Sequence, residues 1–252
     1  MKNKDQNFIQ NFIKEKVEKV YKRNIKEVTD FLDPSEADYC EEFLKKNKEK
    51  VFYSFYGGHT EAERKKLCIA PIGDEITNDD FEIQVLEATA KKINREISHR
   101  DILGAIMGTG IKREKTGDII ILSKGAAIIA DKTMISYLEG NFPVIKNNNF
   151  NIKVFSAEQY SFPEVESTEK IINISSWRLD GIIAKTYNLS RGDSQEIIRS
   201  GKVKVNHKEN LRTDFILSEN DIVSVRTKGR FVIIEELGKT KKDNYRVLIN
   251  IY

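Results

Sequence analysis

Residues 178–206 read RLDGIIAKTYNLSRGDSQEIIRSGKVKVN and combine two kinds of hydrophobic period in one short segment. The apolar residues of 179–183 recur at helical spacing, and those of 197–198 lie on a second helix, which Gly201 ends. Val203 and Val205 then alternate with lysines, as the residues of a half-buried strand do. The segment therefore predicts two short helices and a strand packed on a common core.

Basic and capping residues of this segment fall on the other side of the same elements. Arg178 and Lys185 are seven residues apart and share a helix face. Ser190 is placed to cap the second helix, which puts Arg191 in its first turn, where unpaired N–H groups favour a phosphate. The candidate RNA-binding residues of the segment are Arg178, Lys185, Ser190, Arg191, Asp193, Lys202, Lys204 and Asn206.

Several of these residues also have a structural explanation. Asp193 stands at the third helical position, as a capping box requires, and Asn206 begins a tight turn. Lys202 and Lys204 point outward from the strand, on the side where we expect the arginines. Asp180 or Asp193 could pair with an arginine and hold it in place. From spacing alone, a solvated charged face stays an alternative to an RNA-binding surface.

The distribution of charge favours an anionic partner for the C-terminal part. The whole chain carries 42 Lys and Arg against 39 Asp and Glu, a net charge of +3. Residues 176–252 hold 15 of the basic and 10 of the acidic residues, which leaves 27 and 29 for the rest. A basic C-terminal module on a nearly neutral body is typical of a local polyanion-binding site.

The remaining sequence predicts an α+β protein of three parts. Apolar residues at helical spacing predict a helix over 6–28, and Asp33-Pro34 begins a second helix over 34–46. Residues 1–50 are therefore expected to form an N-terminal helical hairpin. Strands are expected at 52–56 and 67–72, with Thr60 and Glu63 capping a short helix between them.

A central domain is expected at 51–160, and its elements follow a recognisable order. Strands are predicted at 81–89, 117–123, 126–131 and 151–156, and helices at 98–110 and 132–140. The order β-α-β-β-α-β describes a ferredoxin-like or RRM-like domain. A polar linker over 156–170 then leads to a C-terminal domain at 171–252, whose last strand is YRVLINIY.

The central domain contains a basic loop within GTGIKREKTGD, residues 108–118. A P-loop requires a glycine directly before its Lys-Thr pair, between a strand and a helix. Here Glu114 occupies that position, and the segment follows a helix and precedes a strand. We therefore predict a helix end followed by a loop in which Lys112, Arg113 and Lys115 are candidate RNA contacts.

Other chemistry has little support in the sequence. Cys40 and Cys68 belong to no zinc-binding motif, and the three histidines lie in different predicted elements. No nucleophile motif, signal peptide or long apolar helix is evident. We expect a cytoplasmic protein that needs no cofactor and no membrane.

The C-terminal motifs resemble the S4 RNA-binding domain. They are Arg178-Leu179-Asp180, Ser190-Arg191 and the run from Ile198 to Asn206. Ser194 and His207 depart from the residues usual there, alanine and glycine. A histidine adopts a left-handed turn conformation more readily than most residues, so we expect the turn to be kept.

The whole chain is similar to the bacterial YlmH family, through FLDPSE (31–36), DILGAIMGTGIKREKTGDI (101–119) and the S4 motifs. This resemblance implies a helical N-terminus, a central RRM-like domain and a C-terminal S4 domain. It also implies a role on the large ribosomal subunit in quality control of stalled translation. The partners that it implies are large-subunit rRNA, tRNA or peptidyl-tRNA, and other quality-control factors.

Two classes of function compete with one another. The leading hypothesis is a non-enzymatic RNA-binding factor on the ribosome. The alternative is an RNA-modifying enzyme or its accessory, because S4 domains also occur in pseudouridine synthases and methyltransferases. A synthase would place a large catalytic domain after the S4 module, and a methyltransferase would need a glycine motif after its first strand. A scaffold that binds partners through its N-terminal helices is compatible with the leading hypothesis.

Overall fold

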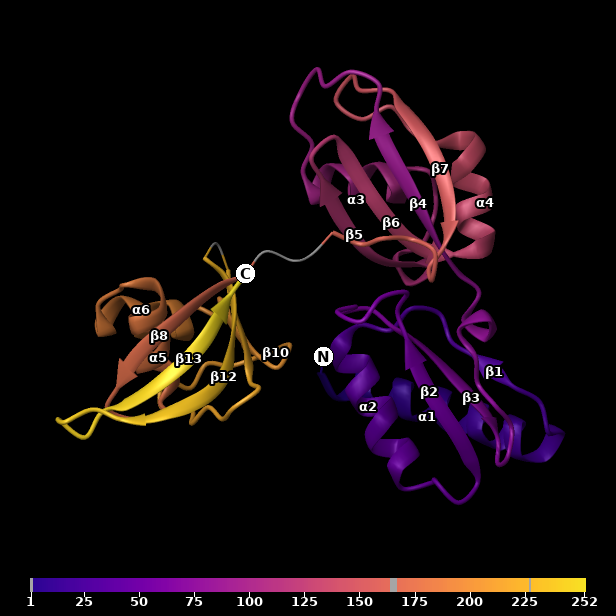
Figure 1. Cartoon of the computed structure of the whole chain (residues 1–252). Coiled ribbons are helices and arrows are strands. Elements are labelled where there is room, and N and C mark those ends of the chain that lie inside the picture. Colours follow the sequence, from indigo (N-terminus) through magenta and orange to yellow (C-terminus); the bar gives the residue numbers. More distant parts are fainter. Residues whose placement is uncertain (1, 164–166, 227) are drawn as a thin grey trace. The chain divides into compact units, whose positions relative to one another are not determined.

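The computed structural model describes residues 2–163, 167–226 and 228–252, with side chains from Ile9 onward. The chain divides into two compact units, Met1–Pro163 and Glu164–Tyr252, which are described separately (Figure 1). Within the described residues, no helix is both long enough and apolar enough to cross a membrane.

Two helices begin the first unit. Helix α1 spans Lys2–Arg23 and ends where Asn24 adopts a left-handed conformation (φ 53°), earlier than the predicted end at residue 28. Helix α2, Pro34–Lys45, is confirmed with its predicted cap. The Asp33 carboxylate accepts from the N–H of Glu36 (2.9 Å), and the Glu36 carboxylate accepts from the N–H of Asp33 (2.7 Å).

These helices pack on a sheet instead of forming a bare hairpin, which corrects the expected N-terminal fold. Strand β3 (Lys66–Pro71) lies between β1 (Glu27–Val28) and β2 (Val51–Tyr56) in an antiparallel sheet. Strands β2 and β3 lie within the range 51–160 that was expected for the central domain. Every residue of β3 is buried, with Leu67 against the α1 and α2 side and Cys68 on the opposite side. A strand covered on both faces carries no alternation that would indicate its sheet.

The short helix predicted at Thr60 is wrong. Residues 59–64 form turns and bends, and Lys65 forms an isolated β-bridge with Leu32. The N–H groups of Glu63 and Arg64 donate to the Asp118 carboxylate at 2.7 and 3.2 Å. Since these donors are held by strand β5 (Thr116–Leu122), a local capping box does not start a helix there.

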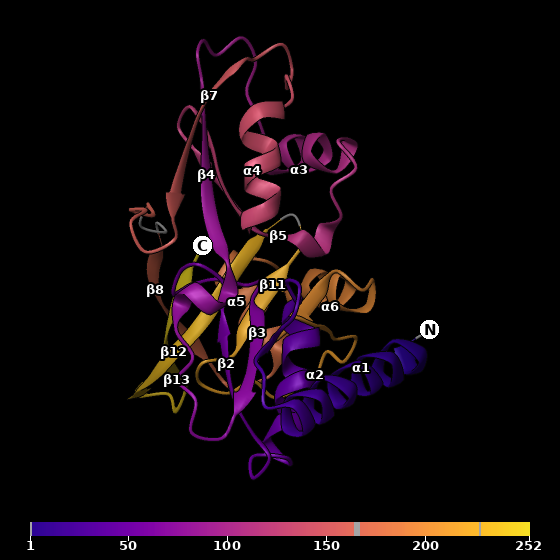
Figure 2. The ribbon, with the colours of Figure 1, turned by 90° about the vertical axis from the view of Figure 1, so that its right-hand side faces the viewer.

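The predicted β-α-β-β-α-β order is confirmed in the central part of the first unit. Strands β5, β6 (Gly125–Asp131), β4 (Ile83–Ala90) and β7 (Phe150–Ser156) pair in that spatial order, antiparallel throughout. Helices α3 (His99–Gly108) and α4 (Lys132–Asn141) cover one face of the sheet (Figure 2). Helix α3 begins with the predicted capping box of Ser98 and Asp101. Short 3-10 turns at Asn78–Phe81 and Arg113–Lys115 precede β4 and β5.

The second unit is a sheet with two helices on one face. Its strands are β8 (Thr168–Ile174), β9 (Val203–Val205), β10 (Lys208–Glu209), β11 (Ile222–Val225), β12 (Gly229–Lys239) and β13 (Tyr245–Ile251). They pair in the order β10-β9-β11-β12-β13-β8. Helices α5 (Leu179–Tyr187) and α6 (Arg191–Arg199) pack against its apolar core. Strand β8 begins inside the segment 156–170 expected to be a linker, of which residues 164–166 lie outside the described part.

Candidate RNA-binding surface

A buried carboxylate joins the two predicted RNA-binding helices. The side chain of Asp180, in the first turn of α5, is 0% exposed. Arg178 donates to it from Nε and Nη2 at 3.2 and 3.1 Å, and Arg191 donates from Nε and Nη2 at 3.1 and 3.4 Å. The Gln195 amide and the Gly181 N–H each donate to it at 2.8 Å. The predicted pairing of an arginine with Asp180 is therefore present, and it involves both arginines.

This network keeps the carboxylate charged and the arginines oriented. Burial would raise the pKa of Asp180, but hydrogen bonds from Arg178, Gln195 and Arg191 outweigh burial and hold the pKa well below its usual range. The two arginine side chains remain 33% and 59% exposed. Because a guanidinium has five N–H donors, Arg191 keeps donors for an anion while it binds Asp180.

The N-terminus of α6 adds backbone donors beside Arg191. The Ser190 side chain accepts a hydrogen bond from the Asp193 N–H at 3.0 Å. Within the described residues, the reciprocal bond of the predicted capping box, from the Ser190 N–H to the Asp193 side chain, is not formed. The N–H groups of Arg191 and Gly192 have no acceptor in the described part of the chain. At α5 the first donors are used, since the Leu179 N–H donates to a carbonyl at 2.8 Å. The helix dipole and unpaired N–H groups thus favour an anion at α6.

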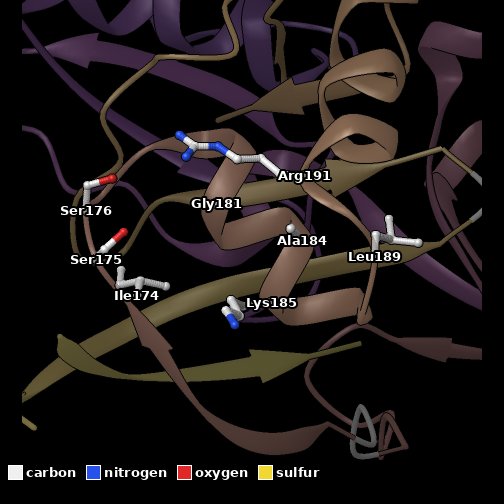
Figure 3. Close-up of a pocket in the computed structure, with 8 residues that line it drawn as sticks. All are labelled: Ile174, Ser175, Ser176, Gly181, Ala184, Lys185, Leu189 and Arg191. Atoms are coloured by element: carbon white, nitrogen blue, oxygen red, sulfur yellow. The ribbon is translucent and has the colours of Figure 1, made fainter. Parts of the chain in front are cut away.

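A cavity of about 260 Å³ lies beside Arg191 (Figure 3). Gly181 and Ala184 line it from α5, where their small side chains leave room. The cavity combines an apolar lining with hydroxyl and cationic groups, as many ligand-binding sites do. Its lining residues are Ile174, Ser175, Ser176, Gly181, Ala184, Lys185, Leu189 and Arg191. Ser175, Ser176 and Gln195 were not among the predicted site residues, although Gln195 follows Arg191 by one helical turn.

The structure separates the remaining candidates of the segment. Lys185 lines the cavity with Arg191. Val203 and Val205 are buried under the helices, so the alternation of β9 points Lys204 to the opposite sheet face. The expectation that Lys204 and Arg191 share one side is therefore wrong. Lys202, just before β9, is exposed.

Asn206 has a structural role in the predicted turn. Asn206 and His207 have φ values of 46° and 64°, so the turn is kept with histidine at its second position. The Asn206 side chain accepts from the Ile222 N–H at 2.9 Å and donates to Asp221 at 2.7 Å. Both polar atoms of the Asn206 side chain are therefore bonded to residues of the same unit.

Most of the predicted basic loop of the central domain is used internally. Arg113 donates to the carbonyls of Thr116 and Gly117 at 2.7 and 2.9 Å. Lys115 forms an ion pair with Asp30 at 2.5 Å. Lys112 is exposed and makes no side-chain bond to the described residues. Of these three cations, Lys112 is therefore the one whose charge stays available to a partner.

On the second face of the central sheet, aromatic side chains pack on one another, Phe155 on Tyr160 and Tyr160 on Phe162. In RRM domains this face stacks bases on aromatic side chains. Here the segment after β7 packs over it with Val85, and Tyr160 donates to Glu87 at 2.9 Å. The rings of Phe162 and His59 stack with centroids 4.8 Å apart. These rings are therefore engaged with side chains of the same unit.

Two short helices on one face of a small antiparallel sheet, with arginines at their beginnings, define the class of S4-domain proteins. The S4 domain model matches residues 177–223, which contain the Asp180 network. A second model, described as "Putative RNA-binding domain in YlmH", matches residues 77–159, the central sheet and its helices.

Comparison with a curated relative identifies the family. The chain is 31% identical over 220 residues to the ribosome-associated protein quality control protein P2 of Bacillus subtilis (strain 168), across 87% of this chain and 85% of the relative. The chain therefore belongs to the YlmH family. A solved structure, the cell division protein ylmH from Streptococcus pneumoniae, has a TM-score of 0.53 and 19% identity. It covers 62% of this chain and 95% of its own, and supports the fold.

Ser194 ties the two helices together below the arginines. Its side chain is buried and its hydroxyl lies 2.9 Å from the carbonyl oxygens of both Asp180 and Arg191. We expect Ser194→Ala to lower the free energy of unfolding by roughly 0.5–1.5 kcal/mol, the usual contribution of one hydrogen bond. Urea denaturation measures it, with Ser200→Ala as the control, because the exposed Ser200 hydroxyl also bonds a helical carbonyl. Equal losses for both variants would contradict a special role for the buried hydroxyl.

Proposed function

We propose that this protein is a non-enzymatic RNA-binding factor of the large ribosomal subunit, which contacts rRNA and tRNA during rescue or quality control of stalled translation. The observation that carries the proposal is the Asp180 network, which binds Arg178 and Arg191 while both side chains stay partly exposed. The proposed location is the cytoplasm, and no cofactor takes part.

The chemistry of the surface fits a phosphate backbone. Arginine binds phosphate through two parallel N–H bonds, and unpaired N–H groups at a helix start add further donors. Lys185 and Arg191 bring cations to the same cavity. Such contacts position RNA without reading its sequence. We propose Arg178, Lys185 and Arg191 as the main contacts, with Ser190 as the cap that shapes the site.

The peripheral candidates have a smaller proposed role. Lys202 and Lys204 of the second unit and Lys112 of the first unit are exposed, and we assign them weaker contacts with RNA. The name of the Bacillus relative refers to ribosome-associated quality control, which supports the ribosome as the partner.

In the described residues, no group of three or more His, Cys, Asp or Glu side chains could hold a metal ion.

Co-sedimentation with purified large subunits tests this function. We expect binding at low salt that weakens as salt rises, because each phosphate contact adds roughly 0.7–0.9 to the slope of log affinity against log salt. Three main cations would give a slope of about −2 to −3. The small subunit is the matched control. Binding that is insensitive to salt, or equal for both subunits, would count against the proposal.

A further inference from the structure

Three loops meet at one end of the central sheet, beyond the carboxyl end of β4 (Figure 1). They are residues 91–98 after β4, the turn at 123–124 between β5 and β6, and residues 142–149 before β7. The Ala90 N–H donates to the Lys124 carbonyl at 2.7 Å, and the Lys91 N–H donates to the Asn149 carbonyl at 2.8 Å. We call this group of residues the loop end of the first unit.

A buried asparagine fixes the shape of the loop end. Asn148 is 0% exposed, its Oδ1 accepts from the Asn94 N–H at 2.7 Å, and its Nδ2 donates to the Arg95 carbonyl at 3.0 Å. The Asn94 side chain donates in return to the Asn147 carbonyl at 2.6 Å. Two loops that are distant in sequence are therefore held as one body.

An ion pair strengthens the same arrangement. Lys146 bonds Asp101 at 2.7 Å and donates to the Glu96 carbonyl at 3.2 Å. Hydrogen bonds from Lys146 and Ser98 lower the pKa of Asp101 to about 2. One cation of the loop end is thus used to hold loops to helix α3.

The other cations of the loop end have no internal role. Lys91, Lys92, Arg95 and Lys124 are exposed, and their side chains make no bond to the described residues. Glu96 is the one carboxylate in these three loops. Ile93, between the cations, is 49% exposed. Arg113 and Lys115 are bonded internally, whereas these four cations keep their charge available to a partner.

We propose that the loop end is a second RNA-binding surface, which holds a phosphate backbone through Lys91, Lys92 and Arg95. A loop that is already ordered loses little conformational entropy on binding, which favours contact with a rigid partner. Cations without internal partners can replace the counterions that surround RNA phosphates. This surface belongs to the first unit, so it does not depend on the Asp180 network.

The test removes the three cations in the full chain. The variant is Lys91→Ala, Lys92→Ala and Arg95→Ala, and the matched control is Lys46→Ala, Lys48→Ala and Lys50→Ala, three exposed lysines of the same unit. Both lose three positive charges. The probes are protein-free rRNA of the large subunit and intact large subunits, each titrated with salt. We expect the salt slope to fall by roughly 2–3 for the loop variant on both probes, and to change little for the control.

The outcomes separate this inference from the proposed function. If the salt slope on free rRNA falls for the loop variant, the inference is supported, even if intact subunits are not bound. Failure to bind intact subunits would contradict only the proposed function. Equal losses in both triple variants, a loss confined to intact subunits, or no RNA binding at all would overturn the inference. Equal losses would indicate an effect of net charge alone. A loss confined to intact subunits would indicate a protein partner.

A crosslinking measurement supplies a readout that does not depend on affinity. A benzophenone amino acid, introduced as Ile93→p-benzoylphenylalanine in the full chain, samples the partner of the loop end directly. We expect crosslinks to rRNA on irradiation with large subunits. The control is Tyr137→p-benzoylphenylalanine on α4, a position that is 44% exposed. Crosslinks to protein alone at position 93, or equal RNA yields at both positions, would contradict the proposal.

Discussion

Asp180→Ala is expected to lower the free energy of unfolding of the second unit by about 3 kcal/mol, the lower end of the range for breaking a buried ion pair. The substitution removes the acceptor of both arginines, of Gln195 and of the Gly181 N–H. The lower end of the range applies because the arginines are partly exposed. Water can therefore replace some of the hydrogen bonds that they lose with Asp180.

Urea denaturation checks this prediction with Glu196→Ala as the control. Glu196 is an exposed carboxylate of α6, and its removal should change stability by less than about 0.5 kcal/mol. Asp180→Asn keeps one acceptor and loses the charge, so it should lie between the two. A loss for Asp180→Ala as small as that of the control would show that the network has no structural role.

The same network predicts how stability responds to acid. The pKa of Asp180 is lowered in the folded protein, so its contribution is complete above the unfolded value of about 3.9. Stability should therefore fall as the pH drops below about 4, and Asp180→Asn should flatten that fall.

The second large effect concerns RNA binding by the arginines. Arg191→Ala should weaken binding to large subunits roughly ten- to a hundredfold, the range for one hydrogen bond to a charged group. Arg178→Ala should act in the same direction. Each single variant leaves one arginine on Asp180, so binding can be measured on folded protein.

The double variant Arg178→Ala, Arg191→Ala behaves differently. It leaves a buried carboxylate without either cation, so we expect a lower melting temperature as well as weaker binding. Arg199→Ala, an exposed arginine at the end of α6, is the control for net charge. If Arg191→Ala and Arg199→Ala weaken binding equally, the surface around Asp180 is not the site. If the double variant keeps both its melting temperature and its affinity, the arginines are solvated residues.

Local patterns in the sequence were enough for most elements. Capping residues such as Asp33 and Ser98 start helices by bonding backbone N–H groups within the same turn, and that depends on neighbours in sequence. The order of elements from β4 to β7 was predicted for the same reason, because hydrophobic period is a local property. The S4 motif likewise identified the two arginines and their aspartate.

Contacts between distant residues decided the rest. Asp118 takes the N–H groups of Glu63 and Arg64, so a predicted helix becomes a turn. Arg113 and Lys115 bond to groups of the same unit, whereas the side chains of Lys91 and Lys92 make no bond to the described residues. The sequence by itself determined which residues carry charge and which elements they lie on. The tertiary structure decided which charges remain available, because a buried carbonyl or carboxylate binds whatever donor the fold brings within about 3 Å.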